Sequence, residues 1–142
     1  MKTTHISNSH KETEQIAKLF AVELSEAGSG IILFGSSAMG AGKTTFTKYI
    51  LKNLCGKENA SSPTFTIINQ YADNIFHADL YRLENEQELQ NTDFFEILEG
   101  NNFVFVEWSD VLKSPVRGNV FSVDIEIKGE AQREFTITRG QK

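Results

Sequence analysis

Apolar residues in the first part of the chain recur at helical spacing. Within residues 11–27, four large apolar side chains are predicted to share one helix face: Ile16, Leu19, Phe20 and Leu24. Ser9 precedes this stretch and Glu12 follows Ser9 by three residues, which is the pattern of a capping box at a helix start. Gly28 and Gly30 are expected to end the helix.

Two runs of consecutive apolar residues predict strands that are buried on both faces of a sheet. They are Ile-Ile-Leu-Phe at 31–34 and Phe-Val-Phe-Val at 103–106. After the first run, a glycine-containing loop leads into a predicted helix from about Lys43. The expected apolar face of this helix consists of Phe46, Tyr49, Ile50 and Leu54.

The other segments are predicted mainly as strands, at 65–71, 74–79, 119–128 and 133–139. The last two form a hairpin around residues 129–130. The acidic stretch 84–99 is expected to be helical in pieces, with apolar residues toward the core at Phe94, Phe95, Ile97 and Leu98. This order predicts an α/β sandwich with a mixed central sheet, parallel near the glycine-containing loop and antiparallel toward the C-terminus.

Length and composition are those of an ordinary globular protein. The 142 residues suit one domain, 1–142, and 39% of them are hydrophobic. No apolar run approaches the roughly 18 residues that a membrane helix needs, and the first residues lack an apolar signal region, so a cytoplasmic location is expected. The net charge of −5 argues against direct nucleic-acid binding, and any RNA contact is expected mainly through a partner.

Residues 37–44, Ser-Ala-Met-Gly-Ala-Gly-Lys-Thr, match most of the phosphate-binding pattern G-x-x-x-x-G-K-[ST]. In a P-loop, backbone N–H groups and the next helix N-terminus bind phosphate, the lysine reaches the β- and γ-phosphates, and the hydroxyl binds Mg²⁺. Gly42, Lys43 and Thr44 match, whereas Ser37 replaces the first glycine and leaves the loop geometry open. The alternative is a glycine-rich turn with an incidental lysine. The buried strand before it and the helix after it favour ATP and Mg²⁺, and so a P-loop NTPase-like three-layer sandwich.

Two acidic residues end predicted strands. Glu107 directly follows the run 103–106, at the strand end where ligands of α/β sheets bind. It is predicted to bind Mg²⁺ together with Thr44, the alternative being a glutamate that faces solvent. Asp79 ends the strand 74–79 and is a candidate to orient or deprotonate the attacking water. A helix-cap or turn aspartate is an equal alternative at this position.

For several residues near these motifs, the sequence leaves open whether the role is functional or structural. Trp108 could stack on a nucleotide base or pack in the core. The segment Ser62-Pro63-Thr64 is a switch-like loop or a plain proline turn. His77 is expected to be structural rather than catalytic, and the spacing of Arg82 does not decide between an ion pair and a phosphate contact.

Four motifs in fixed order resemble one protein family. They are Met-Gly-Ala-Gly-Lys-Thr-Thr-Phe at 39–46, Ser-Pro-Thr-Phe at 62–65, Asp-Leu-Tyr-Arg-Leu at 79–83 and Val-Glu-Trp at 106–108. Together they resemble the bacterial tRNA threonylcarbamoyladenosine biosynthesis ATPase family TsaE, over about residues 8–139. The Asp-Leu-Tyr-Arg and Glu-Trp elements are the specific ones, because many families share the P-loop.

The resemblance implies a cytoplasmic ATPase that supports threonylcarbamoylation of adenosine 37 in tRNA. It implies the partners TsaD and TsaB, which would hold the tRNA and carry out the transfer, while ATP resets the complex between turnovers. By position, the resemblance implies catalytic roles for Asp79, Lys43 and Glu107 and a Mg²⁺ site at Thr44 and Glu107. Thr64 would belong to a switch loop. The implied nucleotide-binding set is Thr13, Met39, Gly40, Ala41, Gly42, Lys43, Thr44, Thr45, Trp108 and Arg133.

Two other functions compete with this one. A small-molecule P-loop kinase would need an acceptor pocket and an arginine-rich lid, and this chain has four scattered arginines and few residues to spare. A module that binds ATP only to assemble a complex is also compatible with the sequence, because Asp79 and Glu107 would serve binding as well as hydrolysis. Hydrolysis by the chain alone is expected to be slow, since no arginine finger is evident in the P-loop segment.

Overall fold

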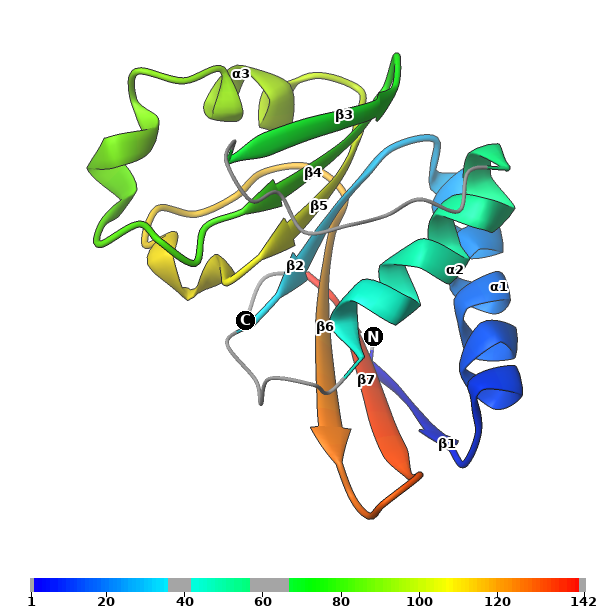
Figure 1. Cartoon of the computed structure of the whole chain (residues 1–142). Coiled ribbons are helices and arrows are strands. Elements are labelled where there is room, and N and C mark those ends of the chain that lie inside the picture. The colour runs from blue at the N-terminus through cyan, green and yellow to red at the C-terminus, as the bar shows by residue number, and fades with distance from the viewer. Residues whose placement is uncertain (1, 36–41, 57–66, 141–142) are drawn as a thin grey trace.

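The computed structural model describes residues 2–35, 42–56 and 67–140 (Figure 1). Its elements in chain order are β1 (Lys2–Ser7), α1 (His10–Ala27), β2 (Gly30–Phe34), α2 (Lys43–Cys55), β3 (Ile68–Ala72), β4 (Ile75–Asp79), η1 (Glu86–Leu89), α3 (Phe94–Glu99), β5 (Phe103–Glu107), η2 (Ser109–Val111), β6 (Val120–Ile127) and β7 (Arg133–Arg139). Within these ranges, no helix is both long and apolar enough to cross a membrane.

The described strands form one seven-stranded sheet with the order β1-β7-β6-β2-β5-β4-β3. β2 lies between β5 and β6 and runs parallel to both, and β4 runs parallel to β5. The pairs β6–β7, β1–β7 and β3–β4 are antiparallel. The predicted mixed sheet is therefore confirmed, with an additional antiparallel pair at the β3 edge.

Both faces of the central strands are buried, as the apolar runs predicted. All five residues of β2 and all five of β5 are buried. Alternate positions of β2 belong to different cores, because Ile32 lies among the side chains of α1 and α2 while Ile31 lies among those of η1 and α3.

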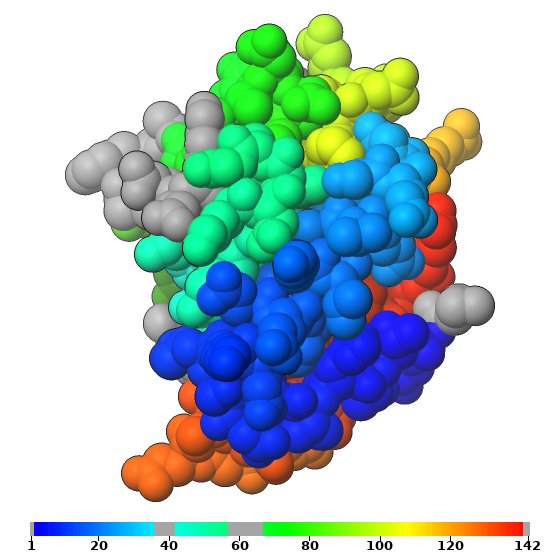
Figure 2. All heavy atoms as spheres, turned by 90° about the vertical axis from the view of Figure 1, so that its right-hand side faces the viewer, coloured from blue at the N-terminus to red at the C-terminus, as the bar shows by residue number. Residues whose placement is uncertain are grey.

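Helices cover the two faces unequally. α1 and α2 lie side by side over one face, the layer that faces the viewer in Figure 2. On the other face, Leu89 of η1 and Phe94 of α3 pack on the half of the sheet that contains β4 and β5. β6 continues beyond this cover, and its positions on that face become polar: Ser122, Asp124 and Glu126. The fold is a three-layer α/β sandwich whose second helical layer is small.

The start of α1 agrees with the capping pattern. Ser9 is the N-cap, and its Oγ accepts a hydrogen bond from the Glu12 backbone N–H at 3.1 Å. The Glu12 carboxylate accepts in return from the backbone N–H of Asn8 at 2.8 Å, one residue before the N-cap. These bonds satisfy N–H groups that a helix start leaves without intrahelical partners.

One helix-face prediction is wrong. Leu19 was expected in the core, but its side chain is 65% exposed. The buried stripe of α1 uses Ala17 and Ala21 instead, which are at most 2% exposed. The small alanine side chains let the helix axis lie close to the sheet. The buried face of α1 therefore includes Ala17 and Ala21, and Leu19 lies outside it.

The strand β1 was not predicted. Its residues Lys2, Thr3 and Thr4 are exposed, so it lacks the apolar alternation that marks a half-buried strand. It forms because its backbone pairs with β7 at the sheet edge, from Lys2 opposite Thr138 to Ser7 opposite Arg133. Only a partner from the other end of the chain creates this strand.

Candidate functional site

The carboxyl ends of β2, β4 and β5 meet at one edge of the sheet, because these strands are parallel neighbours. Gly35 follows β2, Asp79 ends β4 and Glu107 ends β5. Asp79 and Glu107 are register partners on adjacent strands. The two predicted acidic residues therefore lie together, beside the segment that leads into the phosphate loop.

The start of α2 is suited to an anion. Gly42 is the N-cap with φ +103°, a left-handed conformation that favours glycine, and as a glycine it offers no side chain to cap the first turn. A β-carbon added at Gly42 would meet no heavy atom within 4 Å, so the requirement for glycine at this position is conformational. Backbone N–H groups and the helix dipole at such a terminus attract phosphate.

Lys43 spans the two ends of the phosphate loop. It is buried, and its Nζ donates a hydrogen bond to the Gly35 carbonyl oxygen at 3.0 Å. The same Nζ lies 4.7 Å from the centre of the Trp108 ring. Both contacts hold the ammonium group at the carboxyl edge of β2, where the phosphates of a nucleotide would lie.

Trp108 is partly buried, and its ring packs against the core on the α3 side of the sheet while one contact reaches Lys43. Its ring is 4.8 Å from that of Tyr81, between centroids, with 53° between the planes. Its backbone has φ +60° and ψ +44°, the left-handed region, which costs a residue other than glycine about 1–2 kcal/mol. Such strain is concentrated at functional sites, and here it accompanies the turn that follows Glu107.

Glu107 is a buried carboxylate with a defined partner. It is 5% exposed, and its Oε2 lies 2.7 Å from Nε2 of His77, which is itself fully buried. His77 was predicted to be structural, but the structure places it against the predicted Mg²⁺ ligand. A signal for this was present in the sequence, because His77 precedes Asp79 by two residues and strand residues two apart share a face.

Asp79 combines a turn role with an unusual ionisation. One carboxylate oxygen accepts the Tyr81 backbone N–H at 3.0 Å, as expected for a turn aspartate. Burial raises the pKa of the Asp79 carboxyl above its ordinary value of 3.8, and the negative charge of Glu107 acts in the same direction. The hydrogen bond from the Tyr81 N–H and the electrostatic influence of His77 and Lys43 oppose this shift. A carboxylate with a raised pKa is a better proton acceptor than an ordinary one.

Thr13 and Arg133 come together across the whole length of the chain. They line a cavity of about 290 Å³ that Gly42 and Thr45 also line, next to the start of α2. The Thr13 hydroxyl lies 2.6 Å from that of Ser7. The cavity gives the two predicted nucleotide contacts a common location, on the α1 side of the phosphate loop.

The remaining predicted site residues are Thr44 and residues of two loops. Thr44 is exposed in the first turn of α2. Ser37, Met39, Gly40 and Ala41 of the loop, and the segment Ser62-Pro63-Thr64, lie outside the described residues. Among the residues that are described, no group of three His, Cys, Asp or Glu side chains forms a metal site. A Mg²⁺ site would not require such a group, because Mg²⁺ is commonly bound by one or two carboxylates, phosphate oxygens and waters.

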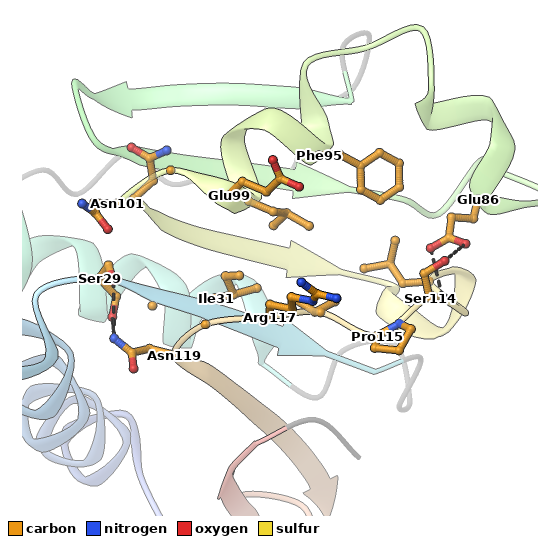
Figure 3. Close-up of a pocket in the computed structure, with 17 residues that line it drawn as sticks. Ser29, Ile31, Glu86, Phe95, Glu99, Asn101, Ser114, Pro115, Arg117 and Asn119 are labelled. Carbon is orange, nitrogen blue, oxygen red and sulfur yellow. Dashed lines mark hydrogen bonds between the residues drawn. The ribbon is translucent and has the colours of Figure 1, made fainter.

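A larger cavity, of about 490 Å³, lies on the face of the sheet that α3 covers, and its lining extends from Ser29 at the start of β2 to Ser114, beyond the end of β5 (Figure 3). Its rim includes Ser29, Arg117 and Asn119. Glu86 and Ser114 line it as well, and the Glu86 carboxylate accepts hydrogen bonds from the Ser114 backbone N–H at 3.1 Å and from its hydroxyl at 2.9 Å. The lining residues of this cavity do not include Lys43, Asp79 or Glu107, so it is separate from the site at the carboxyl ends of the strands.

Comparison with known proteins points to one family. Residues 7–135 match the family model described as threonylcarbamoyl adenosine biosynthesis protein TsaE. The chain is 37% identical over 139 residues to the tRNA threonylcarbamoyladenosine biosynthesis protein TsaE of Rickettsia typhi, covering 95% of this chain and 94% of that protein. It is also 37% identical over 131 residues to the Bacillus subtilis protein of the same name, covering 90% and 80%.

A solved structure supports the same relationship. The crystal structure of Bacillus subtilis YdiB superposes with a TM-score of 0.73 and 28% sequence identity, covering 99% of this chain and 87% of that one. The similarity therefore extends over the whole sandwich, including the strands that carry Asp79 and Glu107.

Proposed function

Because this chain belongs to the TsaE family of threonylcarbamoyl adenosine biosynthesis proteins, we propose that it binds ATP with Mg²⁺ and hydrolyses it in support of tRNA modification. Its part in tRNA threonylcarbamoyladenosine biosynthesis follows from the family. The observation that supports the ATPase proposal is the convergence of Lys43, Asp79 and Glu107 at one sheet edge, beside the start of α2, whose N-cap is Gly42.

The residues at this edge fit Mg²⁺-ATP. Lys43 and the N-terminal amides of α2 would bind the phosphates, while the Thr44 hydroxyl and the Glu107 carboxylate would bind Mg²⁺. Bound Mg²⁺ would neutralise charge on the β- and γ-phosphates. Asp79 would orient the attacking water and accept its proton, and Trp108 would lie alongside the nucleotide.

The proposal includes the protein partners TsaD and TsaB, through which the chain would act on tRNA mainly indirectly. The net charge of −5 supports this division of labour, because an acidic protein repels the phosphates of RNA. The proposal also includes a cytoplasmic location, where the partners would act on tRNA.

The isolated chain is expected to hydrolyse ATP slowly and to be accelerated when TsaB and TsaD are added together. Arg117 lines the separate cavity under α3, and the Arg139 guanidinium lies 5.1 Å from the Phe121 ring centre near the start of β6. Arg133 lines the cavity beside Gly42, but its Nη1 donates to the backbone carbonyls of Gly129 and Gln132. Transition-state charge on a transferring phosphoryl group commonly needs an arginine. Phosphate release, measured with and without the two partners, tests this, and fast turnover by the chain alone would refute it.

Reconstitution tests the biological role. The chain, TsaB and TsaD are mixed with unmodified tRNA, threonylcarbamoyl donor and ATP, and rounds of modification per complex are counted. We expect repeated rounds only when both this chain and ATP are present. Repeated rounds without ATP would reject ATP hydrolysis as the resetting step, and phosphate transfer to a small acceptor faster than to water would restore the kinase alternative.

Arg133→Ala is expected to weaken ATP binding about ten- to a hundredfold, because loss of one charge-assisted hydrogen bond costs about 1.5–3 kcal/mol. Arg133 lines the cavity beside Gly42 and Thr45, where a nucleotide on the phosphate loop would extend. Isothermal titration calorimetry measures the change. Arg139→Ala is the matched control, since its guanidinium packs on Phe121 at the other edge. Equal affinities of the two variants would remove Arg133 from the nucleotide site.

A further inference from the structure

A buried hydrogen bond joins the ends of β4 and β5. His77 Nε2 and Glu107 Oε2 are 2.7 Å apart, His77 has no exposed surface and Glu107 is 5% exposed. Both side chains point to the face of the sheet that α1 and α2 cover, since they alternate with Ala78 and Val106 of the opposite core. A bond this short and dry restricts the carboxylate to one orientation.

A third strand continues the chain of contacts. The Tyr71 hydroxyl of β3 lies 3.4 Å from Nδ1 of His77, and the two ring centroids are 6.1 Å apart. Nδ1 accepts if the phenol hydrogen points to it, and the imidazole hydrogen then lies on Nε2. Nε2 is the nitrogen that must donate, because an ionised carboxylate such as Glu107 can only accept. The contacts of the two ring nitrogens are mutually consistent with one tautomer.

We propose that His77 is a positioning residue for the Mg²⁺ site: it holds the Glu107 carboxylate in its metal-binding orientation through an Nε2–H donor, and Tyr71 fixes the tautomer that makes this possible. The inference rests on the proposed function, in which Glu107 is a Mg²⁺ ligand. According to this inference, the contacts from Tyr71 to His77 and from His77 to Glu107, which join three neighbouring strands, increase the affinity for Mg²⁺ and do not serve fold stability alone. Residues that hydrogen-bond to a metal ligand generally orient it, and their loss lowers metal affinity or activity about 10–100-fold.

The test is the gain in nucleotide affinity that Mg²⁺ produces. Calorimetry with a non-hydrolysable ATP analogue gives the dissociation constant in excess EDTA and in Mg²⁺, and their ratio is the Mg²⁺ gain. We expect His77→Asn to lower this ratio about tenfold or more while leaving the EDTA value unchanged. His77→Gln is expected to keep most of the gain, because its amide NH₂ can reach near the position of Nε2 whereas that of Asn lies nearer Nδ1.

The two amides are matched in polarity and differ mainly in where the donor lies. A merely structural role would affect both variants alike and would leave the Mg²⁺ gain unchanged, so that result overturns the inference. Phe94→Leu, a core change on the opposite face of the sheet, shows what general destabilisation does to the ratio. If neither His77 variant folds, Tyr71→Phe decides: a lowered Mg²⁺ gain supports the inference, and a wild-type gain overturns it.

A spectroscopic readout is independent of binding. Nitrogen-15 NMR of the labelled imidazole in the whole protein distinguishes its tautomers, and we expect the hydrogen on Nε2. A hydrogen on Nδ1 alone would overturn the inference. Glu107→Gln distinguishes a failure of the proposed Mg²⁺ site from a failure of the role proposed for His77. If wild type shows no Mg²⁺ gain, the proposed function fails and the inference fails with it. If Glu107→Gln abolishes the gain and His77→Asn does not, only the inference fails.

Discussion

Lys43→Met is expected to weaken ATP binding by about thirtyfold or more. Truncating one partner of a buried, hydrogen-bonded charge pair costs about 2–5 kcal/mol, and each 1.4 kcal/mol is about a factor of ten in affinity. Lys43 is buried, and its Nζ is held between the Gly35 carbonyl and the Trp108 ring, so the ammonium group is already in place for phosphate. Methionine keeps the length of the apolar stem and removes only the charge and the donor.

Calorimetry measures this effect, and thermal unfolding shows whether the fold survives the loss of the bond to Gly35. Lys48→Met is the matched control, because Lys48 is an exposed lysine on the same helix. Its ATP affinity is expected to equal that of the wild type. A folded Lys43→Met protein with unchanged ATP affinity would reject the P-loop interpretation altogether.

Asp79→Asn is expected to slow ATP hydrolysis by about 10²–10⁴-fold, the usual contribution of a positioned general base. ATP affinity is expected to stay near the wild-type value. The asparagine oxygen can still accept the Tyr81 N–H, so the turn that follows β4 is preserved while the basic carboxylate is lost. Phosphate release under single-turnover conditions, in the complex with TsaB and TsaD, measures the chemical step.

Asp73→Asn makes the same chemical change in the exposed turn between β3 and β4 and is expected to leave hydrolysis unchanged. Two results would change the role of Asp79. If Asp79→Asn lost ATP binding and hydrolysis equally, Asp79 would be a binding residue. If hydrolysis were undiminished, the role of Asp79 would be limited to stabilising the turn after β4.

Most elements follow from local pattern. The capping residues at Ser9, the apolar runs of β2 and β5 and the helix from Lys43 all appear where the sequence predicts them. The two errors, the burial of Leu19 and the missing strand β1, arise because packing and pairing with distant segments override the local pattern. Leu19 belongs to the helical period of α1 but lies outside the stripe that packs, because the alanines of α1 determine how closely the helix approaches the sheet. β1 carries no apolar signal, because its pairing with β7 stabilises it.

Local chemistry also indicated much of the candidate site. Gly42 and Lys43 belong to a motif in which neighbouring residues bind one phosphate group, and Glu107 directly follows a buried strand. Strand ends in parallel sheets converge at one edge, so the proximity of Asp79 and Glu107 was predictable in outline. Their roles stay predictions, to be tested as above.

By itself, the sequence determined the family and the mixed α/β class, and it indicated the glycine, lysine and strand-end acids of the proposed phosphate site, because each motif consists of residues close together in the chain. The strand order, the covering of the sheet faces and the position of Thr13 and Arg133 in one cavity were decided only by the tertiary structure. So was the bond from His77 to Glu107. The physical reason is that pairing between distant segments depends on which backbones and side chains approach after the chain folds, and no spacing within one segment encodes that approach.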